Sequence, residues 1–117
     1  MIIYKKFIFD AAHFLPGVPD GHKCKNMHGH TYGLTLFAEG PVKQPEGWVV
    51  DFADLKATVK PVLDRLDHHC LNDIPGLDNP TSEILAIWLW SQLKPLIPGL
   101  KRIELNETPT SGAIFEG

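Results

Sequence analysis

The sequence has little of several features that mark particular protein classes. Only two of its 117 residues, Cys24 and Cys70, are cysteines, far fewer than a disulfide-stabilised small domain carries. The longest apolar run, residues 84–90, is seven residues long, whereas a membrane-spanning helix needs about 20. Eleven basic residues face 14 acidic ones, for a net charge of −3. Without a basic surplus to bind phosphates, nucleic acid is not expected as a partner, and neither is a membrane.

The chain also lacks repeats, low-complexity tracts and a linker-like segment. Its N-terminus begins with apolar residues, but Lys5 and Lys6 interrupt them within one strand length, so no secretory signal pattern is present. With 44% hydrophobic and 21% charged residues, the composition suits one ordinary hydrophobic core. We therefore expect a single domain over residues 1–117, in the cytoplasm and with both thiols reduced.

Two segments alternate in polarity as strands do. The first covers residues 2–13 and the second residues 28–39, with a loop rich in proline and glycine between them. One face of the first strand carries Ile3, Phe7, Phe9, Ala11 and His13, and one face of the second carries His28, His30, Tyr32, Leu34, Leu36 and Ala38.

The rest of the chain predicts two helices and two more strands. One helix runs from an Asp51 cap to about Leu66, and the other starts with Asn79 as cap and Pro80 as first position. Residues 67–79 between them form a polar segment without a predicted element, and strands follow over 101–108 and 112–116. The order β-β-α-α-β-β predicts an α+β fold, an antiparallel sheet with two helices on one face. Because the other face also carries apolar residues and the edges are open, we expect oligomerisation through the sheet.

Histidine gives the strongest chemical signal. His28 and His30 are two apart on a strand and so point the same way, and His13 ends the preceding strand. Three neutral imidazoles suit Zn²⁺ and leave a fourth position open, as catalytic sites do. Cys24 lies four residues before His28, between Lys23 and Lys25, whose charges favour a thiolate. The residues alone leave open whether it is a fourth ligand, an inert buried thiol, or a base or nucleophile.

Two further acidic positions are ambiguous. Asp67 and His68 are adjacent and do not face each other on a helix or strand, so the pattern favours a plain helix C-terminus there. Glu107 alternates with Ile103 and Leu105, which points its carboxylate to the apolar side of its strand. A ligand with two parallel N–H groups would satisfy a carboxylate there. By itself, however, the position favours a strand-end glutamate turned to water.

Several motifs together are similar to those of one known family. They are Phe9-Asp10-Ala11-Ala12-His13, Gly21-His22-Lys23-Cys24, the Cys-x-x-x-His-Gly-His of residues 24–30, Leu66-Asp67-His68-His69, Asn79-Pro80-Thr81-Ser82-Glu83 and Glu107-Thr108. With them the chain resembles the 6-pyruvoyltetrahydropterin synthase superfamily along essentially its whole length, most closely the bacterial branch of 6-carboxy-5,6,7,8-tetrahydropterin synthases of queuosine biosynthesis. The spacing Cys-x-x-x-His-Gly-His resembles that branch, since the animal pyruvoyl synthases typically have two more residues there.

The resemblance implies a fold, an assembly and residue roles. The implied fold is the T-fold (tunnelling fold), in which subunits join their sheets into a barrel with sites between them, here as a homohexamer of two trimers. His13, His28 and His30 match the zinc ligands, and Cys24 matches the catalytic proton acceptor. His68 matches the catalytic histidine with Asp67 orienting it, and Glu107 matches the pterin anchor. Thr81 and Ser82 match residues that line the pterin pocket. Phe115 departs from the tyrosine that family members often carry, which puts only the terminal contacts in doubt.

The implied reaction converts 7,8-dihydroneopterin triphosphate to 6-carboxy-5,6,7,8-tetrahydropterin, acetaldehyde and triphosphate. Two alternatives remain at this stage. A 6-pyruvoyltetrahydropterin synthase would use the same site to eliminate triphosphate without breaking a carbon–carbon bond. A non-catalytic, zinc-stabilised module would only bind a pterin or purine, although the joint presence of Cys24, Asp67 and His68 argues against it.

Overall fold

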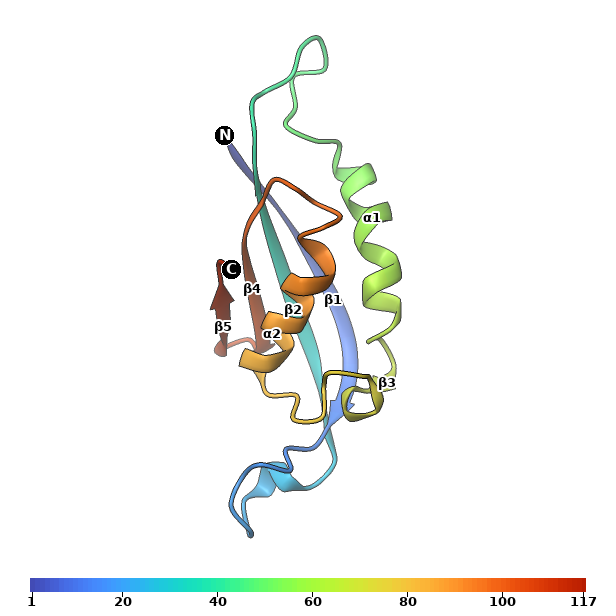
Figure 1. The fold of residues 1–117 in the computed structure, drawn as a ribbon, viewed down its shortest axis with the longest axis vertical. Helices are drawn as coiled ribbons and strands as arrows, with labels where there is room; N and C mark the ends of the chain where they lie inside the picture. Colours follow the sequence, from blue (N-terminus) through green and yellow to red (C-terminus); the bar gives the residue numbers. More distant parts are fainter.

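Two long strands form the centre of the structure. In the computed structural model, which describes residues 1–117, β1 (Ile2–His13) and β2 (His28–Glu39) pair antiparallel over all 12 residues. The loop between them and the loop between β2 and the first helix project from opposite ends, so the molecule is 58 Å long (Figure 1). Both strands therefore have the extent that their alternating sequences predict.

Three more strands complete the sheet. β4 (Leu100–Thr108) lies antiparallel to β2, β5 (Ser111–Phe115) lies antiparallel to β4, and β3 (His69–Cys70) lies on the other side of β1, giving the order β3-β1-β2-β4-β5. β4 and β5 start and end within one residue of their predicted bounds. β3 was not predicted, and it runs parallel to β1, so the expectation of a purely antiparallel sheet is wrong at this edge. Two residues are too few to show alternation.

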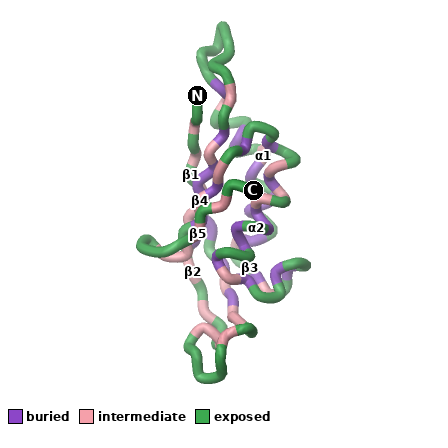
Figure 2. The backbone as a smooth tube through the Cα atoms, turned by 60° about the vertical axis from the view of Figure 1, so that its left-hand side comes forward, coloured by how far each residue is buried: buried purple, intermediate pink, exposed green.

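Both helices, α1 (Phe52–Asp64) and α2 (Ser82–Leu93), lie on one side of the sheet, as predicted (Figure 2). They enclose one hydrophobic core of 23 buried residues. The sheet contributes to it the side chains that the alternation assigns to the inner face, among them Phe9, Tyr32 and Leu34. The opposite face carries exposed apolar side chains, including Tyr4 and Ile8. Neither helix is both long and apolar enough to cross a bilayer.

The helix starts show one correct and one wrong prediction. Asp51 caps α1, since its carboxylate accepts from the Ala53 N–H at 2.9 Å, although the helix ends at Asp64, two residues before the predicted end. The cap of α2 is Thr81, whose hydroxyl accepts from the Ile84 N–H at 3.2 Å, and not Asn79. Asn79 instead forms a tight turn before the helix, in which its carbonyl accepts from the Thr81 N–H at 2.9 Å.

Candidate metal centre and active site

Three histidines meet at one end of the covered sheet face. The β1–β2 ladder pairs His13 with His28 and Ala11 with His30, and all three imidazoles point to the side that the helices cover. Their ring centroids are 4.5 to 5.0 Å apart, and His13 is fully buried. The structure thus brings together the three side chains that the sequence predicts as metal ligands.

Backbone carbonyls fix which nitrogen of two of these rings carries the proton. His13 Nδ1 lies 2.9 Å from the Pro80 carbonyl oxygen, and His28 Nδ1 lies 2.7 Å from that of Asn26. A carbonyl only accepts, so each Nδ1 must donate its hydrogen, which leaves a lone pair on Nε2 in the neutral ring. Burial lowers the pKa of His13 and outweighs the raising effects of the Pro80 bond and of the Glu107 charge, so the neutral form is favoured.

The free nitrogens of the three rings converge. The Nε2 atoms of His13 and His28 are 3.0 Å apart, and with both lone pairs facing each other this is not a stable hydrogen bond between neutral rings. His30 Nε2 is buried and has no hydrogen-bond partner. A cation with imidazole ligands would satisfy all three nitrogens at once. The three imidazole nitrogens therefore fit Zn²⁺. In zinc sites, each ligating histidine usually donates its other N–H to a carbonyl or a carboxylate, as His13 and His28 do here.

Glu107 joins this group from β4. Its Oε1 lies 2.8 Å from His30 Nε2, without hydrogen-bond geometry, and 3.8 Å from His13 Nε2. Its Oε2 accepts a hydrogen bond of 2.5 Å from the hydroxyl of Ser82, the first residue of α2. The alternation that pointed Glu107 inward is confirmed, and the reading as a glutamate turned to water is wrong. One possible ligand atom from each of the four residues lies within 4.8 Å of the others.

Tyr32 is a residue of this site that the sequence did not single out. It is buried next to the histidines on β2, and its ring stacks on Phe9 with centroids 5.0 Å apart. Its hydroxyl oxygen is 3.3 Å from His13 Nδ1. Burial, and secondly the charge of Glu107, raise the pKa of Tyr32, so the phenol stays neutral. Its place on the same face of β2 as His28 and His30 was visible in the alternation, but its contact with His13 was not.

Asp67 and His68 do form a pair, which the adjacency argument had disfavoured. His68 has a left-handed backbone with φ of 59°, so its side chain turns back and places Nδ1 3.0 Å from Asp67 Oδ2. The strand β1 holds this turn, because the Asp10 N–H donates to Asp67 Oδ1 at 2.9 Å and the Asp10 carbonyl accepts from the His68 N–H at 2.6 Å. Helix and strand geometry keep neighbouring side chains apart, but a single left-handed residue follows neither geometry.

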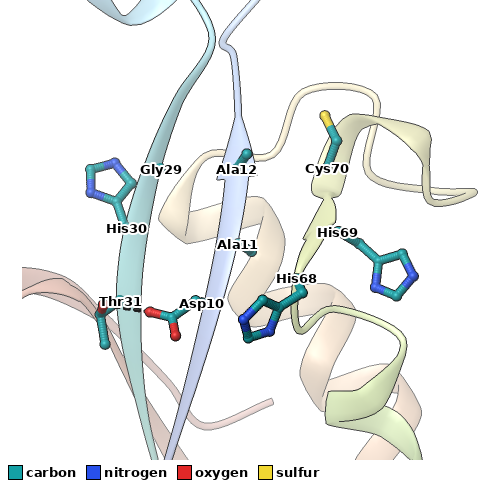
Figure 3. A pocket seen from close by; sticks show the side chains of 9 residues that line it. All are labelled: Asp10, Ala11, Ala12, Gly29, His30, Thr31, His68, His69 and Cys70. Carbon is teal, nitrogen blue, oxygen red and sulfur yellow. Dashed lines mark hydrogen bonds between the residues drawn. The ribbon is translucent and has the colours of Figure 1, made fainter.

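This pair is separate from the histidine cluster within one chain. His68 clusters with the carboxylates of Asp67 and Asp10, and Asp10 projects from the face of β1 opposite to His13. In Figure 3, β1 runs between His30 on one side and His68 on the other. A hollow of about 550 Å³ extends over this region, lined by Asp10, Ala11, Ala12, Gly29, His30, Thr31, His68, His69 and Cys70.

Cys24 lies in the projecting loop, on a short 3-10 turn over Lys23–Lys25. Its N–H donates to His22 Nδ1 at 3.1 Å, its carbonyl accepts from the Leu15 N–H at 2.8 Å, and its side chain is half-buried. Its sulfur is not among the ligand atoms that gather around the histidines, so the geometry gives no support to Cys24 as a fourth ligand. Cys24 and Cys70 are both free thiols.

Replacing Asp67 by Asn tests the pair directly. The bond to Asp67, and secondly the Asp67 charge, raise the pKa of His68, while the Asp10 N–H and then His68 lower the pKa of Asp67. In Asp67→Asn the pKa of His68 should fall toward its ordinary value near 6.5, so that His68 loses its proton at lower pH. An NMR titration of the histidine ring protons measures this. His22 in the same spectra is the control, and an unchanged His68 midpoint would contradict the pairing.

The chain and its fold match known proteins along nearly their whole length. A 6-carboxy-5,6,7,8-tetrahydropterin synthase of Synechocystis sp. is 44% identical, over 97% of this chain and 92% of its own. A dihydroneopterin monophosphate aldolase of Pyrococcus furiosus is 39% identical, over 98% and 96%. The solved structure of Caenorhabditis elegans 6-pyruvoyl tetrahydropterin synthase superposes with a TM-score of 0.92 at 30% identity, covering 100% of this chain and 95% of that one.

The structural match confirms the predicted α+β T-fold. A sequence profile described as 6-pyruvoyl tetrahydropterin synthase matches residues 2–117. The chain therefore belongs to the 6-pyruvoyl tetrahydropterin synthase family.

Proposed function

We propose that this chain is a zinc-dependent 6-carboxy-5,6,7,8-tetrahydropterin synthase. With one water, it would convert 7,8-dihydroneopterin triphosphate to 6-carboxy-5,6,7,8-tetrahydropterin, acetaldehyde and triphosphate, as a cytoplasmic enzyme of queuosine biosynthesis formed by one domain over residues 1–117. The observation that carries the proposal is the convergence of three imidazole nitrogens, two of them fixed as acceptors by backbone carbonyls, beside a carboxylate. That arrangement suits a metal and a polar substrate together.

The choice of reaction rests on two features of the sequence. The relative of that name is 44% identical over nearly the whole chain, and three residues separate Cys24 from His28, the spacing that resembles the carboxy synthases. The overall reaction needs no external oxidant, because the pterin ring gains the two electrons that the side chain loses when its first carbon becomes a carboxyl group.

His13, His28 and His30 would hold the metal through Nε2. Bound there, Zn²⁺ supplies Lewis-acid chemistry that makes hydroxyl and neighbouring C–H protons of the substrate side chain more acidic. The Pro80 and Asn26 carbonyls keep His13 and His28 in the tautomer that such a role needs. These contacts orient the rings before substrate arrives, so little reorganisation remains for the bound state.

Glu107 would anchor the pterin ring. Two carboxylate oxygens match the two parallel N–H groups on the amino-pyrimidinone edge of a pterin. The Ser82 hydroxyl already holds Oε2 from the start of α2, where Thr81 is the cap, and so sets the plane of the carboxylate. An anchored ring puts the side-chain carbons at a defined distance from the metal and from Cys24, which is how positioning accelerates a proton transfer.

Cys24 and His68 would move the protons. Cys24, with lysines on both sides, would accept a proton from the substrate side chain, and His68 would act on the opposite side. The Asp67 carboxylate raises the pKa of His68 and fixes which ring nitrogen faces it. A histidine poised this way can both hold and release a proton near neutral pH.

One chain alone does not supply all these groups to one substrate. The three histidines lie on the face of the sheet that the helices cover. The Asp67–His68 pair lies on the other side of β1, next to side chains of the uncovered face. The sheet also has two open edges, β5 and the part of β1 before Ala11, and exposed Ile8 and Tyr4 on its uncovered face. We therefore propose that chains join edge to edge into a homohexamer of two trimers, in which His68 of one chain completes the site of its neighbour.

Product analysis tests the proposed reaction. Zinc-loaded protein incubated with 7,8-dihydroneopterin triphosphate should release acetaldehyde and yield a product with the mass of 6-carboxy-5,6,7,8-tetrahydropterin. The monophosphate ester serves as a parallel substrate, because one relative is a dihydroneopterin monophosphate aldolase. Loss of triphosphate without acetaldehyde would instead identify a 6-pyruvoyltetrahydropterin synthase. Tight pterin binding without any turnover would identify a binding module.

Two substitutions separate metal binding from ring binding. His28→Ala removes one of three ligands and should abolish both zinc retention and activity. Glu107→Gln places an amide donor against a ring donor, so pterin affinity should fall by about tens- to a thousandfold while zinc stays bound. Zinc competition against a chelator and pterin titration by calorimetry measure the two effects. If Glu107→Gln releases zinc as His28→Ala does, Glu107 is a metal ligand and not the ring anchor.

Mixed oligomers test the shared site. His28→Ala and His68→Ala should each be inactive alone, but random co-assembly in equal amounts should recover about a quarter of wild-type activity, because that fraction of sites combines the intact His28 of one chain with the intact His68 of another. A mixture of His28→Ala with His13→Ala is the control and should recover none. Equal failure of both mixtures, with co-assembly shown by differently tagged chains, would place all the groups in one chain.

A further inference from the structure

The side chain of Asn72 makes several hydrogen bonds to the backbone, although Asn72 has no part in the chemistry proposed above. It lies in the short 3-10 helix Leu71–Asp73, directly after β3. Its side-chain Oδ1 accepts from the Phe14 N–H at 3.0 Å, and its Nδ2 donates to the Phe14 carbonyl at 2.8 Å. The same Nδ2 is 3.3 Å from the Asp78 carbonyl. The amide is partly buried and uses both its donor and its acceptor on the backbone.

The side chain of Asn72 continues the pairing of β3 with β1. His69 and Cys70 lie opposite Ala11 and Ala12, after which the main chain turns away into the 3-10 helix. A carboxamide offers one N–H and one C=O side by side, as a strand does, so Asn72 can replace the missing strand residue opposite Phe14. Asn72 thereby holds the chain that follows β1 at Phe14, one residue after His13.

The bond to the Phe14 carbonyl leads directly to Cys24. That carbonyl shares a trans peptide plane with the Leu15 N–H, and in such a plane the two groups point in opposite directions. Asn72 takes the carbonyl side, and the Leu15 N–H donates to the Cys24 carbonyl at 2.8 Å on the other side. One peptide group therefore connects Asn72 to the main chain of Cys24, and hydrogen bonds in such a chain polarise one another.

Hydrogen bonds give little other support to the loop that carries Cys24. The hydrogen bonds of residues 15–26 all stay within residues 14–28, including those of Lys25 to Asp20 and to the Val18 carbonyl. The hydrogen bonds that tie the loop to the rest of the molecule are thus at its two bases, with Met27 against Cys70 and Gly17 near Asn79 as further contacts. His28 holds one base through the Asn26 carbonyl, and Asn72 holds the other through Phe14.

We infer that Asn72 is a positioning residue that sets where Cys24 stands relative to the three histidines, acting through the Phe14–Leu15 peptide group. The catalytic role of Cys24 in this inference rests on the proposed function, whereas the connection from Asn72 to Cys24 does not. Loss of Asn72 should affect the position of Cys24 but not metal binding. His13 keeps its ladder partner His28 and its Pro80 bond, so metal binding survives, whereas Cys24 loses its anchor.

The test is Asn72→Asp, which keeps the shape and one acceptor but removes both donors and faces two carbonyls with a charge. We expect kcat to fall at least about tenfold, while KM and zinc affinity stay within about threefold. Alkylation of Cys24, followed by peptide mass so that Cys70 is counted separately, should become at least about threefold faster, and the Leu15 amide should exchange faster. Asn106→Asp makes the same chemical change at an exposed residue whose side chain makes no hydrogen bond, and should leave all five quantities unchanged.

Several outcomes would overturn the inference. Fast hydrogen exchange of the Leu15 amide in the wild-type protein would overturn it. This measurement needs no variant, so it decides the question even if Asn72→Asp does not fold. Unchanged kcat in Asn72→Asp and in Asn72→Ala would also overturn it, and so would parallel losses of zinc affinity and kcat, since these indicate a general structural role. If the wild-type protein has no turnover, the proposed function fails, but amide exchange and Cys24 alkylation still decide whether Asn72 holds the loop.

Discussion

The site depends on the register of one pair of strands. Because β1 and β2 pair over 12 residues, His13 stands opposite His28 and Ala11 opposite His30. A slip of one residue would move His28 and His30 to the uncovered face and replace them with Gly29 and Thr31. The same alternation buries Phe9 and Leu34 a few residues away, so the packing of the core is what prevents that slip. The arrangement of the three imidazoles on one face thus follows from hydrophobic burial.

The second half of the chain adds groups that complete what the strands begin. The Pro80 carbonyl fixes the tautomer of His13, Ser82 holds Glu107, and Glu107 approaches from β4. These demands also explain the late start of α2. The Pro80 carbonyl faces an imidazole and not an amide four residues ahead, so the helix begins after it, at the cap Thr81. The contact of Pro80 with His13 and the start of α2 at Thr81 therefore depend on each other.

The sequence predicted what repeats along the chain and missed what depends on single contacts. Period-two alternation placed His13, His28 and His30 on one face and turned Glu107 inward, and the helix pattern placed both helices. Strand β3 is too short to alternate, and the left-handed backbone of His68 leaves no trace in a hydrophobic pattern. The closeness of Glu107 to His30 depends on the register of β2 against β4, and the bonds of Asn72 to Phe14 span 58 residues. Such non-local contacts appear only once the chain is folded.

The bond from His13 to Pro80 also joins groups 67 residues apart, and this has a consequence for biosynthesis. When the ribosome has released β1 and β2, all three imidazoles are present, but His13 Nδ1 still lacks the backbone carbonyl that holds its proton. The carbonyl that does so arrives only when α2 is made, and Glu107 arrives later still. A nascent hairpin therefore has all three imidazoles and the carbonyl that orients His28, but not the one that orients His13. Under the proposed function, full zinc affinity would belong to the completed chain, and loading with zinc would be a late step.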